Sequence, residues 1–268
     1  MNTRAIAEQF VRSRLRAEAL PDFPGEVPAT LEEAYATQDC AISLWPDRVA
    51  GWKVGRIDPP WAERLGEDRL VGPIFSQAIR AASPGDCPEF PVFAGGFAAV
   101  EAEFVFRLLD DAPPDKTSWT AADAAQLPSA LHVGIETAGS PLAQINDLGP
   151  LVVVCDFGNN AGLLLGPEIA DWRGRSFASL LCETFIEERS AGSGGALSLP
   201  GGPLAALAFA LRRCAARGRP LTAGEVVSTG ATTGIHDIRS GEQVRVQFEG
   251  VTELRSRAVP AIRHSGRV

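Results

Sequence analysis

The sequence has few histidines, only two lysines and no apolar run of about 18 residues, and each of these absences excludes a class of protein. Without a long apolar run, we expect no membrane-spanning helix and no membrane partner. The three histidines, His132, His236 and His264, show no His-x-x-x-His spacing. This argues against a histidine-rich metal centre and against a histidine-based catalytic triad. Residues 1–10 are amphipathic and lack the apolar segment of a signal peptide, so we expect a cytoplasmic location.

Cysteine usage, net charge and missing motifs exclude further functions. The five cysteines are odd in number and scattered, without Cys-x-x-Cys spacing, which predicts reduced, mostly buried thiols and neither a disulfide framework nor a zinc site. The formal net charge of −8 argues against a nucleic-acid partner, which would need a basic face. The sequence contains no P-loop, no Gly-x-Gly-x-x-Gly that opens a helix and no Gly-x-Ser-x-Gly. Ser193 lies in a glycine-rich segment that we expect to be a loop.

The patterns along the chain predict helices first and strands afterwards. At 268 residues, with 45% hydrophobic and 22% charged residues, the chain is long enough for one large domain or two small ones. Apolar spacing predicts a helix over residues 3–19, and a capping box formed by Thr30 and Glu33 predicts a second helix. A third helix is expected over residues 203–217. The predicted strands are short apolar runs separated by Gly and Pro, at residues 51–57, 70–75, 97–109, 130–137, 151–157, 161–165, 225–229 and 241–250.

Three glutamates in two of these predicted strands form a candidate metal site. Glu101 and Glu103 are one residue apart, so they share a strand face and their Cα atoms lie roughly 7 Å apart. Glu136 lies in the following apolar run. If the two strands are neighbours, three carboxylates converge, which is costly unless a positive charge lies between them. A hard divalent cation such as Mg²⁺ would meet that need, because it takes oxygen ligands and keeps positions open for water or substrate.

Both the glutamates and the nearby lysine also have plainer interpretations. A Glu-x-Glu pair can equally form the solvated face of an amphipathic sheet. Lys53 lies in a short apolar segment between Gly51 and Gly55, and the only other lysine, Lys116, lies in a polar turn. Lys53 therefore either reaches from a strand edge to solvent or points into a pocket as a titratable amine.

Two polar segments could face a substrate. Residues 156–162, Asp-Phe-Gly-Asn-Asn-Ala-Gly, separate two apolar runs, and they form either a plain turn or a loop that presents amide groups. Residues 229–234, Thr-Gly-Ala-Thr-Thr-Gly, end a predicted strand and are rich in hydroxyl groups and glycine. Such loops can offer backbone N–H groups to a carboxylate, and they can also be ordinary turns.

Taken in order, these segments resemble the fumarylacetoacetate hydrolase superfamily, specifically its hydratase and decarboxylase branch. The resemblance covers nearly the whole chain, and the order and spacing of its motifs are more specific than any single motif. The Gly-x-Lys-x-Gly element around Lys53 points to the hydratase and decarboxylase branch. The segments that carry the resemblance are residues 31–38, 51–55, 72–75, 100–104, 135–136, 156–166, 202–207 and 229–244.

The resemblance implies an α+β fold, in which a mixed β-roll like the C-terminal domain of fumarylacetoacetate hydrolase follows a helical N-terminal portion. We therefore expect residues 1–80 to form the helical portion with the lysine-bearing strand, and residues 81–268 to form the metal-binding catalytic β-roll. The resemblance also implies a homo-oligomer with a place in aromatic catabolism. The implied site residues are Lys53 as the catalytic residue, Glu101, Glu103 and Glu136 as ligands of Mg²⁺ or Mn²⁺, and Ser76, Asp156, Asn159, Thr229 and Thr232 as substrate-binding residues.

The implied activity is the addition of water to a short 2-hydroxy-2,4-dienoate or 2-oxo-enoate through a metal-stabilised enolate. A 2-oxo acid decarboxylase or an acylpyruvate hydrolase could use the same site, and a non-catalytic member that binds a 2-oxo acid or serves as a partner subunit is a further alternative. The chain departs from the branch around the substrate. Ser76 stands where the branch has Asp, Gly139-Ser140-Pro141 replaces Asp-Ser-Arg, and Asn159-Asn160 replaces two serines.

Overall fold

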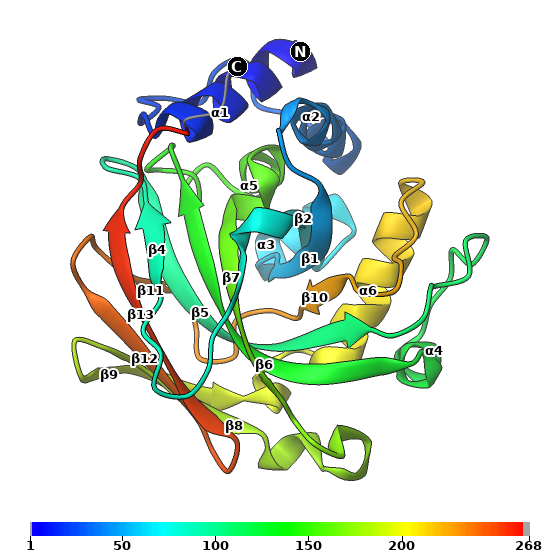
Figure 1. The fold of residues 1–268 in the computed structure, drawn as a ribbon. Coiled ribbons are helices and arrows are strands. Elements are labelled where there is room, and N and C mark those ends of the chain that lie inside the picture. Colours follow the sequence, from blue (N-terminus) through cyan, green and yellow to red (C-terminus); the bar gives the residue numbers. More distant parts are fainter. Residues whose placement is uncertain (1, 265–268) are drawn as a thin grey trace.

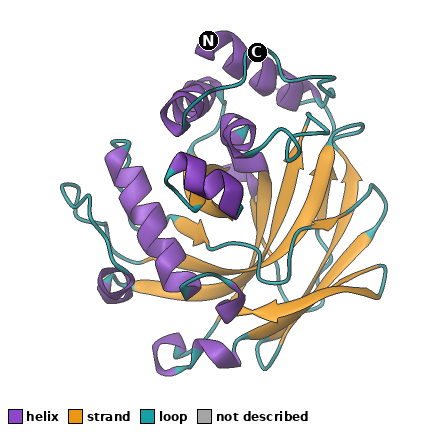
Figure 2. Ribbon diagram, turned by 180° about the vertical axis from the view of Figure 1, so that it is seen from behind, coloured by secondary structure: helices purple, strands orange, loops and turns teal. Residues whose placement is uncertain are grey.

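The computed structural model describes residues 2–264, which form two β-sheets flanked by helices (Figures 1 and 2). The helices are α1 (Thr3–Arg16), α2 (Leu31–Leu44), α3 (Pro59–Leu65), α4 (Ala121–Gln126), α5 (Pro150–Cys155) and α6 (Gly202–Ala216). The strands are β1 (Val49–Arg56), β2 (Arg69–Phe75), β3 (Ile79–Ala81), β4 (Glu89–Val92), β5 (Phe97–Leu108), β6 (Ser129–Ser140), β7 (Asn160–Glu168), β8 (Leu181–Ile186), β9 (Arg189–Gly195), β10 (Val226–Ser228), β11 (His236–Asp237), β12 (Gln243–Phe248) and β13 (Thr252–Pro260).

The larger sheet has eight strands and carries the site. Its order is β2-β1-β10-β5-β6-β7-β3, and β11 pairs with β5 outside this path. The pairing of β1 with β10 is parallel, whereas β10, β5, β6 and β7 pair antiparallel. The smaller sheet has five strands in the order β4-β13-β12-β8-β9. This mixture of two sheets and six helices within residues 2–264 confirms the predicted α+β fold.

The two faces of β5 carry different side chains, one apolar and one with two glutamates. Val100, Ala102 and Phe104 alternate along one face, which packs toward the smaller sheet, where the ring centroids of Phe104 and Phe248 lie 5.8 Å apart. The intervening residues Glu101 and Glu103 therefore point to the opposite side. The β5 residues from Ala102 to Val105 are buried on both faces of the strand. The side of β5 that carries the glutamates is therefore enclosed as well. The sequence alternation thus separates the apolar core from a buried polar site on a single strand.

The helical predictions are confirmed, with shifted ends. The hydroxyl of Thr30 accepts a hydrogen bond from the Glu33 amide at the start of α2. The Glu33 carboxylate, however, accepts from the amide of Ala29, so only half of the predicted capping box forms. In Figure 1, α1 and α2 lie together at one end of the molecule, and α6 packs against α4, β1 and β2.

Two predictions of local structure were wrong. Residues 151–157, expected to be a strand, form α5 and a 3₁₀ turn, η2 (Phe157–Asn159). Such a short, continuously apolar run suits a buried helix as well as a strand, and Pro150 favours a helix start. Ser193, expected in a loop, lies in β9. There the absence of a side chain at Gly194 lets the strand approach the carbonyl of Thr232 more closely than a Cβ would allow.

The predicted division of the chain at residue 80 stays a prediction. The lysine-bearing strand β1 pairs with β10 in the same sheet as the glutamate-bearing strands. The site therefore depends on segments from both sides of that boundary.

A buried ion pair fastens the N-terminal helix to this sheet. The guanidinium of Arg14 in α1 donates to both carboxylate oxygens of Asp156, at 2.5 and 2.9 Å. It also donates to the carbonyl oxygens of Gly139 and Asn160, at 2.8 and 3.0 Å. Asp156 is wholly buried and accepts a further hydrogen bond from Ser140 at 2.6 Å. The charge of Asp156 is therefore neutralised only as long as α1 stays docked.

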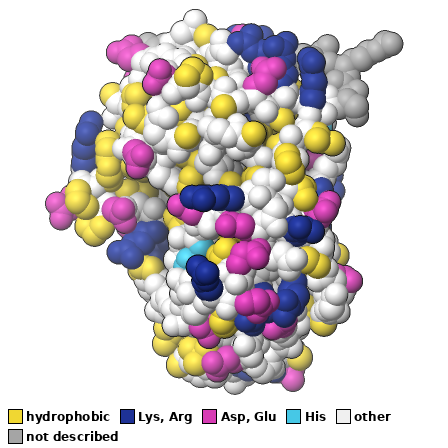
Figure 3. Space-filling view, turned by 90° about the vertical axis from the view of Figure 1, so that its left-hand side faces the viewer, with side chains coloured by type: hydrophobic (Ala, Val, Ile, Leu, Met, Phe, Trp, Pro, Cys, Tyr) yellow, Lys and Arg dark blue, Asp and Glu magenta, His cyan; other side chains and the backbone are white. Residues whose placement is uncertain are grey.

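Within residues 2–264, none of the helices has the length and apolar character needed to cross a bilayer. On the face that Figure 3 shows, acidic and basic side chains are interspersed.

Replacing Arg14 with Ala should destabilise the protein by about 3–5 kcal/mol, because it leaves the buried carboxylate of Asp156 without its cation. Urea unfolding followed by circular dichroism measures the change. Arg12→Ala is the matched control, since Arg12 is exposed on the same helix, and it should shift the free energy of unfolding by less than about 0.5 kcal/mol. Equal effects of the two substitutions would show that the ion pair does not hold α1 in place.

Candidate metal centre and active-site cavity

Pairing of β5 with β6 brings the three predicted glutamates together. Glu101 lies directly opposite Glu136 in the antiparallel ladder, and Glu103 lies opposite Gly134. One carboxylate oxygen from each glutamate can be chosen so that all three oxygens lie within 4.8 Å of one another. The prediction that the two strands are neighbours and that their acids converge is confirmed. The alternative of a solvated sheet face is wrong, because Glu101 is 4% exposed and Glu103 and Glu136 are wholly buried.

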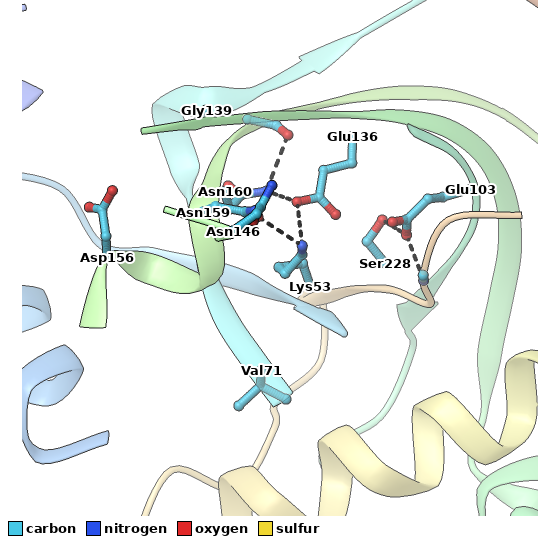
Figure 4. A network of polar contacts seen from close by, with 12 residues as sticks. Lys53, Val71, Glu103, Glu136, Gly139, Asn146, Asp156, Asn159, Asn160 and Ser228 are labelled. Atoms are coloured by element: carbon cyan, nitrogen blue, oxygen red, sulfur yellow. Dashed lines mark hydrogen bonds and ion pairs between the residues drawn. The ribbon is translucent and has the colours of Figure 1, made fainter. Parts of the chain in front are cut away.

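Each glutamate keeps one buried oxygen without a hydrogen-bond partner among residues 2–264: Glu101 Oε1, Glu103 Oε1 and Glu136 Oε2. The second oxygen of Glu103 accepts from the Ser228 hydroxyl and, at 2.9 Å, from the amide of Gly230. The second oxygen of Glu136 accepts from the side-chain amide of Asn160 at 3.1 Å. Figure 4 shows these contacts around the carboxylates. Hydrogen bonds thus orient Glu103 and Glu136, and each of the three acids keeps one oxygen without a hydrogen bond.

Burial and mutual repulsion disfavour the charged forms of these acids. Burial is the largest cause that raises the pKa of Glu101, to about 7; the nearby Lys53 opposes it and the Glu136 carboxylate adds to it. Burial also raises the pKa of Glu103 well above its ordinary value, and Glu136 and Glu101 add to that effect. A buried cluster of this kind is stabilised by any cation that can reach the free oxygens.

Lys53 supplies one cation from the neighbouring part of the sheet. Its ammonium Nζ lies 3.1 Å from Glu136 Oε1 and 3.2 Å from Asn159 Oδ1, and the side chain is buried (Figure 4). Burial alone would lower the pKa of Lys53, but Glu136, Glu101 and Glu103 together outweigh burial and raise it. An ammonium has three N–H donors, so one remains for a further acceptor. Lys53 is therefore buried and lines a cavity, and it does not reach to solvent from a strand edge.

The turn at residues 157–159 holds the partner of Lys53 in place. Phe157, Gly158 and Asn159 have φ angles of 56°, 64° and 54°, three successive residues in the left-handed region, which is strained for the two that carry side chains. The turn lies against β2, where a Cβ on Gly72 would collide with the Phe157 carbonyl. A Cβ on Gly158 would lie 3.3 Å from Lys53 Cδ. Asn159 also donates from Nδ2 to Asn146 Oδ1 at 3.1 Å, which fixes the orientation of its amide.

These groups face a cavity of about 440 Å³. Lys53, Glu101, Asn159 and Thr229 are among its lining residues. The hydroxyl of Thr229 donates to the Phe104 carbonyl, so the backbone of residues 229–231 and not a free hydroxyl faces the cavity most directly. Of the five predicted substrate-binding residues, the structure brings Asn159 and Thr229 to this cavity.

The other three predicted substrate-binding residues lie elsewhere. Asp156 is buried with Arg14 and Ser140, and in Figure 4 it stands apart from Lys53 and the glutamates. Ser76 donates to Asp47 at 2.6 Å near the end of β2. Thr232 donates to the Ala102 carbonyl at 2.6 Å and contacts Cys182. None of these three lines the cavity, because each is engaged in holding backbone segments together.

Several residues that shape the site were not among the predicted site residues, although Asn160 and Gly230 lie in the two polar segments that the sequence singled out. Asn160, Ser228 and Gly230 orient the carboxylates, and Asn146 orients Asn159. Ser228 immediately precedes the hydroxyl-rich loop, so its role could have been inferred had the pairing of β10 with β5 been known. Asn146 lies in a turn between β6 and α5, where the sequence offers no comparable signal.

The three acids fit a divalent metal ion. Three buried carboxylates converge, one oxygen on each lacks a hydrogen bond, and hard cations such as Mg²⁺, Ca²⁺ and Mn²⁺ take oxygen ligands. The nearby thiol of Cys182 bonds to Thr232 outside the cavity. The donor set is thus one of oxygen only, typical of a magnesium or manganese site and unlike a structural zinc site.

Comparison with known proteins agrees with this geometry, although no family model matches the chain. The sequence is 27% identical over 231 residues to 2-keto-4-pentenoate hydratase of Paraburkholderia xenovorans strain LB400, covering 84% of this chain and 83% of that protein. It is equally similar to 2-keto-4-pentenoate hydratase 3 of Pseudomonas putida. Both similarities extend over most of the two chains that are compared.

Solved structures share the fold. The 4-oxalocrotonate decarboxylase of Pseudomonas putida G7, complexed with magnesium and adipate, superposes with a TM-score of 0.79 at 17% identity, over 96% of this chain and 97% of that one. The fumarylpyruvate hydrolase of Pseudomonas aeruginosa, in complex with Mn²⁺ and pyruvate, gives a TM-score of 0.58 at 17% identity, over 81% and 91% of the two chains. The chain is thus similar in sequence to 2-keto-4-pentenoate hydratases and shares its fold with a 4-oxalocrotonate decarboxylase and a fumarylpyruvate hydrolase.

Proposed function

We propose that this protein is a divalent-metal-dependent hydratase that adds water to a short 2-hydroxy-2,4-dienoate or 2-oxo-enoate. One observation carries the proposal. Three buried glutamates, each with an oxygen that has no hydrogen-bond partner among residues 2–264, converge beside the Lys53 ammonium, and Lys53 and Glu101 line one cavity. The sequence similarity to 2-keto-4-pentenoate hydratases supports hydration as the reaction.

Glu101, Glu103 and Glu136 would hold the metal ion, and Mg²⁺ or Mn²⁺ is the ion we propose. Both suit an all-oxygen site, and solved structures of the same fold contain Mg²⁺ or Mn²⁺. When bound, the ion would supply Lewis-acid stabilisation of negative charge on the 2-oxo oxygen of the substrate.

Lys53 would act beside the substrate as an acid and a fixed positive charge. The surrounding carboxylates raise its pKa and so favour the protonated form, which gives Nζ a positive charge and N–H donors beside the substrate. Two of its three N–H groups are directed at Glu136 and Asn159. The third is free to donate to a substrate in the cavity.

The proton movements of hydration can be written with this donor. The dienol releases its O–H proton to water and gains a proton from Lys53 Nζ at the terminal carbon C5, which gives a 2-oxo-3-enoate. A water molecule then adds its oxygen at C4 and releases one proton. Of this proton and the one released from the dienol, one goes to C3 and the other returns to Nζ. One water is consumed without any change in oxidation level, and the product is a 4-hydroxy-2-oxo acid.

The reaction class is tested by incubating the purified protein with Mg²⁺ and 2-hydroxypenta-2,4-dienoate and identifying the products. Hydration gives a 4-hydroxy-2-oxo acid. Parallel assays with a 2-oxo dicarboxylic acid and with an acylpyruvate identify the alternatives, because decarboxylation releases CO₂ and hydrolysis gives a pair of acids. CO₂ or an acid pair, without any hydration product, would replace the proposed hydratase by a decarboxylase or a hydrolase.

Replacing Glu103 with Gln should remove binding of Mg²⁺ and keep the fold. The neutral amide resembles the protonated acid that burial favours in the metal-free protein. A thermal-shift titration should show stabilisation of the unaltered protein by Mg²⁺, about 2.7 kcal/mol at a concentration one hundred times the Kd. Glu103→Gln should show none, and the exposed Glu168→Gln on β7 should respond like the unaltered protein. Normal stabilisation of Glu103→Gln would overturn the ligand assignment.

Replacing Lys53 with Met should lower kcat by about 10²–10⁴-fold, the usual contribution of a positioned proton donor. Methionine keeps an unbranched apolar side chain and removes the ammonium. Steady-state kinetics with 2-hydroxypenta-2,4-dienoate gives the measurement. Lys116→Met is the matched control, because Lys116 pairs with Asp123 away from the cavity, and its kcat should stay within twofold. A Lys53→Met protein with normal kcat would leave Lys53 without a catalytic role.

A further inference from the structure

The cavity that contains Lys53 extends well beyond the charged groups. It follows β1, where Lys53, Gly55 and Ile57 all line it. At the strand rise of about 3.3 Å per residue, these positions span about 13 Å. Gly55 keeps the passage open, because a Cβ there would lie 3.1 Å from Leu70 Cδ1 and 3.7 Å from Lys53 Nζ. The ammonium end of the cavity is thus continuous with a second compartment.

The walls of this second compartment are apolar. They come from five separate segments: the end of β1 with α3, the start of β2, α5, the loop that precedes α6 and the loop that precedes β11. The side chains concerned are Ile57, Trp61, Leu70, Val153, Leu199 and Ile235. Ile235 is 53% exposed, so it has apolar surface that a ligand in the cavity could bury.

Trp61 is the largest of these side chains and is held from both sides. The indole lies so close to Gly149 that a Cβ there would come within 2.7 Å of Trp61 Cζ2. On another side, the Arg64 guanidinium lies 5.0 Å from the ring centroid. Gly149 therefore leaves room for the ring, and Arg64 restrains it. A fixed aromatic wall is a typical means of selecting an apolar ligand group.

The charged residues around the compartment cancel one another. Arg56, Asp58, Asp68 and Arg69 also line the cavity, two of each sign. Arg69 is bound to Asp68 at 2.9 Å and also donates to the Pro200 carbonyl, so its guanidinium is already occupied. Arg56 and Asp58 form no ion pair among residues 2–264, but the four charges sum to zero, so the compartment has no net positive charge that would favour a second carboxylate on the substrate.

The volume agrees with a ligand longer than five carbons. At the roughly 30 Å³ that a water molecule takes in the liquid, 440 Å³ corresponds to about fifteen waters. A five-carbon 2-oxo-enoate, with about eight carbon and oxygen atoms, would fill no more than about half of this space. The remainder is the apolar compartment.

Resting on the proposed function, we infer that the substrate is a monocarboxylic 2-oxo acid, or its enol, that carries an apolar substituent at the far end. Its carboxylate and 2-oxo group face Glu101 and Lys53, and the substituent passes Gly55 and packs against Trp61 and Ile235. These two side chains determine specificity and take no part in the chemistry.

Binding of stable 2-oxo acids tests this inference without turnover. Isothermal titration in the presence of Mg²⁺ would compare oxalate, pyruvate, 4-methyl-2-oxopentanoate and 2-oxoglutarate. Each buried methylene should tighten binding about fourfold, so 4-methyl-2-oxopentanoate should bind at least about tenfold tighter than pyruvate. The second carboxylate of 2-oxoglutarate should give no such gain. Equal binding of 4-methyl-2-oxopentanoate and pyruvate, or tightest binding of 2-oxoglutarate, would overturn the inference.

Two variants locate the substituent. Trp61→Ala should raise the Kd of 4-methyl-2-oxopentanoate by about tenfold, because apolar contact is lost. The Kd of oxalate should stay within twofold. Trp119→Ala is the matched control, because Trp119 is a half-buried tryptophan that contacts Lys116 and does not line the cavity. Ile235→Lys should tighten the binding of 2-oxoglutarate and so reverse the preference for 4-methyl-2-oxopentanoate over 2-oxoglutarate. Unchanged binding of 4-methyl-2-oxopentanoate and 2-oxoglutarate by both variants would place the substituent elsewhere and overturn the inference.

The oxalate measurement separates this inference from the proposed function. Oxalate has no substituent and reports only on the metal and the charged groups. No Mg²⁺-dependent binding of oxalate or pyruvate would overturn the proposed function and the inference together. Mg²⁺-dependent binding of oxalate, with no gain from an apolar substituent, would overturn the inference alone.

Discussion

The burial of three carboxylates around one ammonium is the constraint on which the rest of the site depends. Acids taken out of water raise one another's pKa, and a single lysine cannot neutralise three of them. The structure offers hydrogen bonds to Glu103 and Glu136 but leaves an oxygen free on every member. The surrounding fold therefore holds three carboxylates that one ammonium does not neutralise. The site needs a further cation, as expected of a preorganised cation site.

Much of the site could be predicted from the sequence because a strand has a period of two. Alternation placed Glu101 and Glu103 on one face, and the similar apolar run around Glu136 suggested a neighbouring strand. For Lys53 the sequence left two interpretations open, a strand edge that reaches solvent and a pocket, and only its burial in the structure decides between them. The inferences about the glutamates need only local pattern and one assumed strand pairing.

The remaining features of the site depend on contacts between distant residues, which a local sequence pattern does not reveal. Residues 151–155 are apolar throughout, so their period could not distinguish a strand from the helix that they form. Asp156 was predicted to bind substrate because of the family resemblance and its place in the polar segment 156–162. Its actual partner, Arg14, lies 142 residues away in the sequence, and such a distant pairing leaves no trace in local composition. The same is true of Asn146 and of the apolar wall around Trp61.

The parallel pairing of β1 with β10 has a consequence for how the enzyme comes into being. Lys53 is in register with Ser228, the residue that donates to Glu103. The first and last components of the site are therefore neighbours in space but separated by most of the polypeptide. Contacts of such long range form slowly, because a large loop must close before they contribute any stability. On a ribosome the glutamates would be made well before β10, so the complete cation-binding arrangement can assemble only when synthesis of the chain is nearly finished.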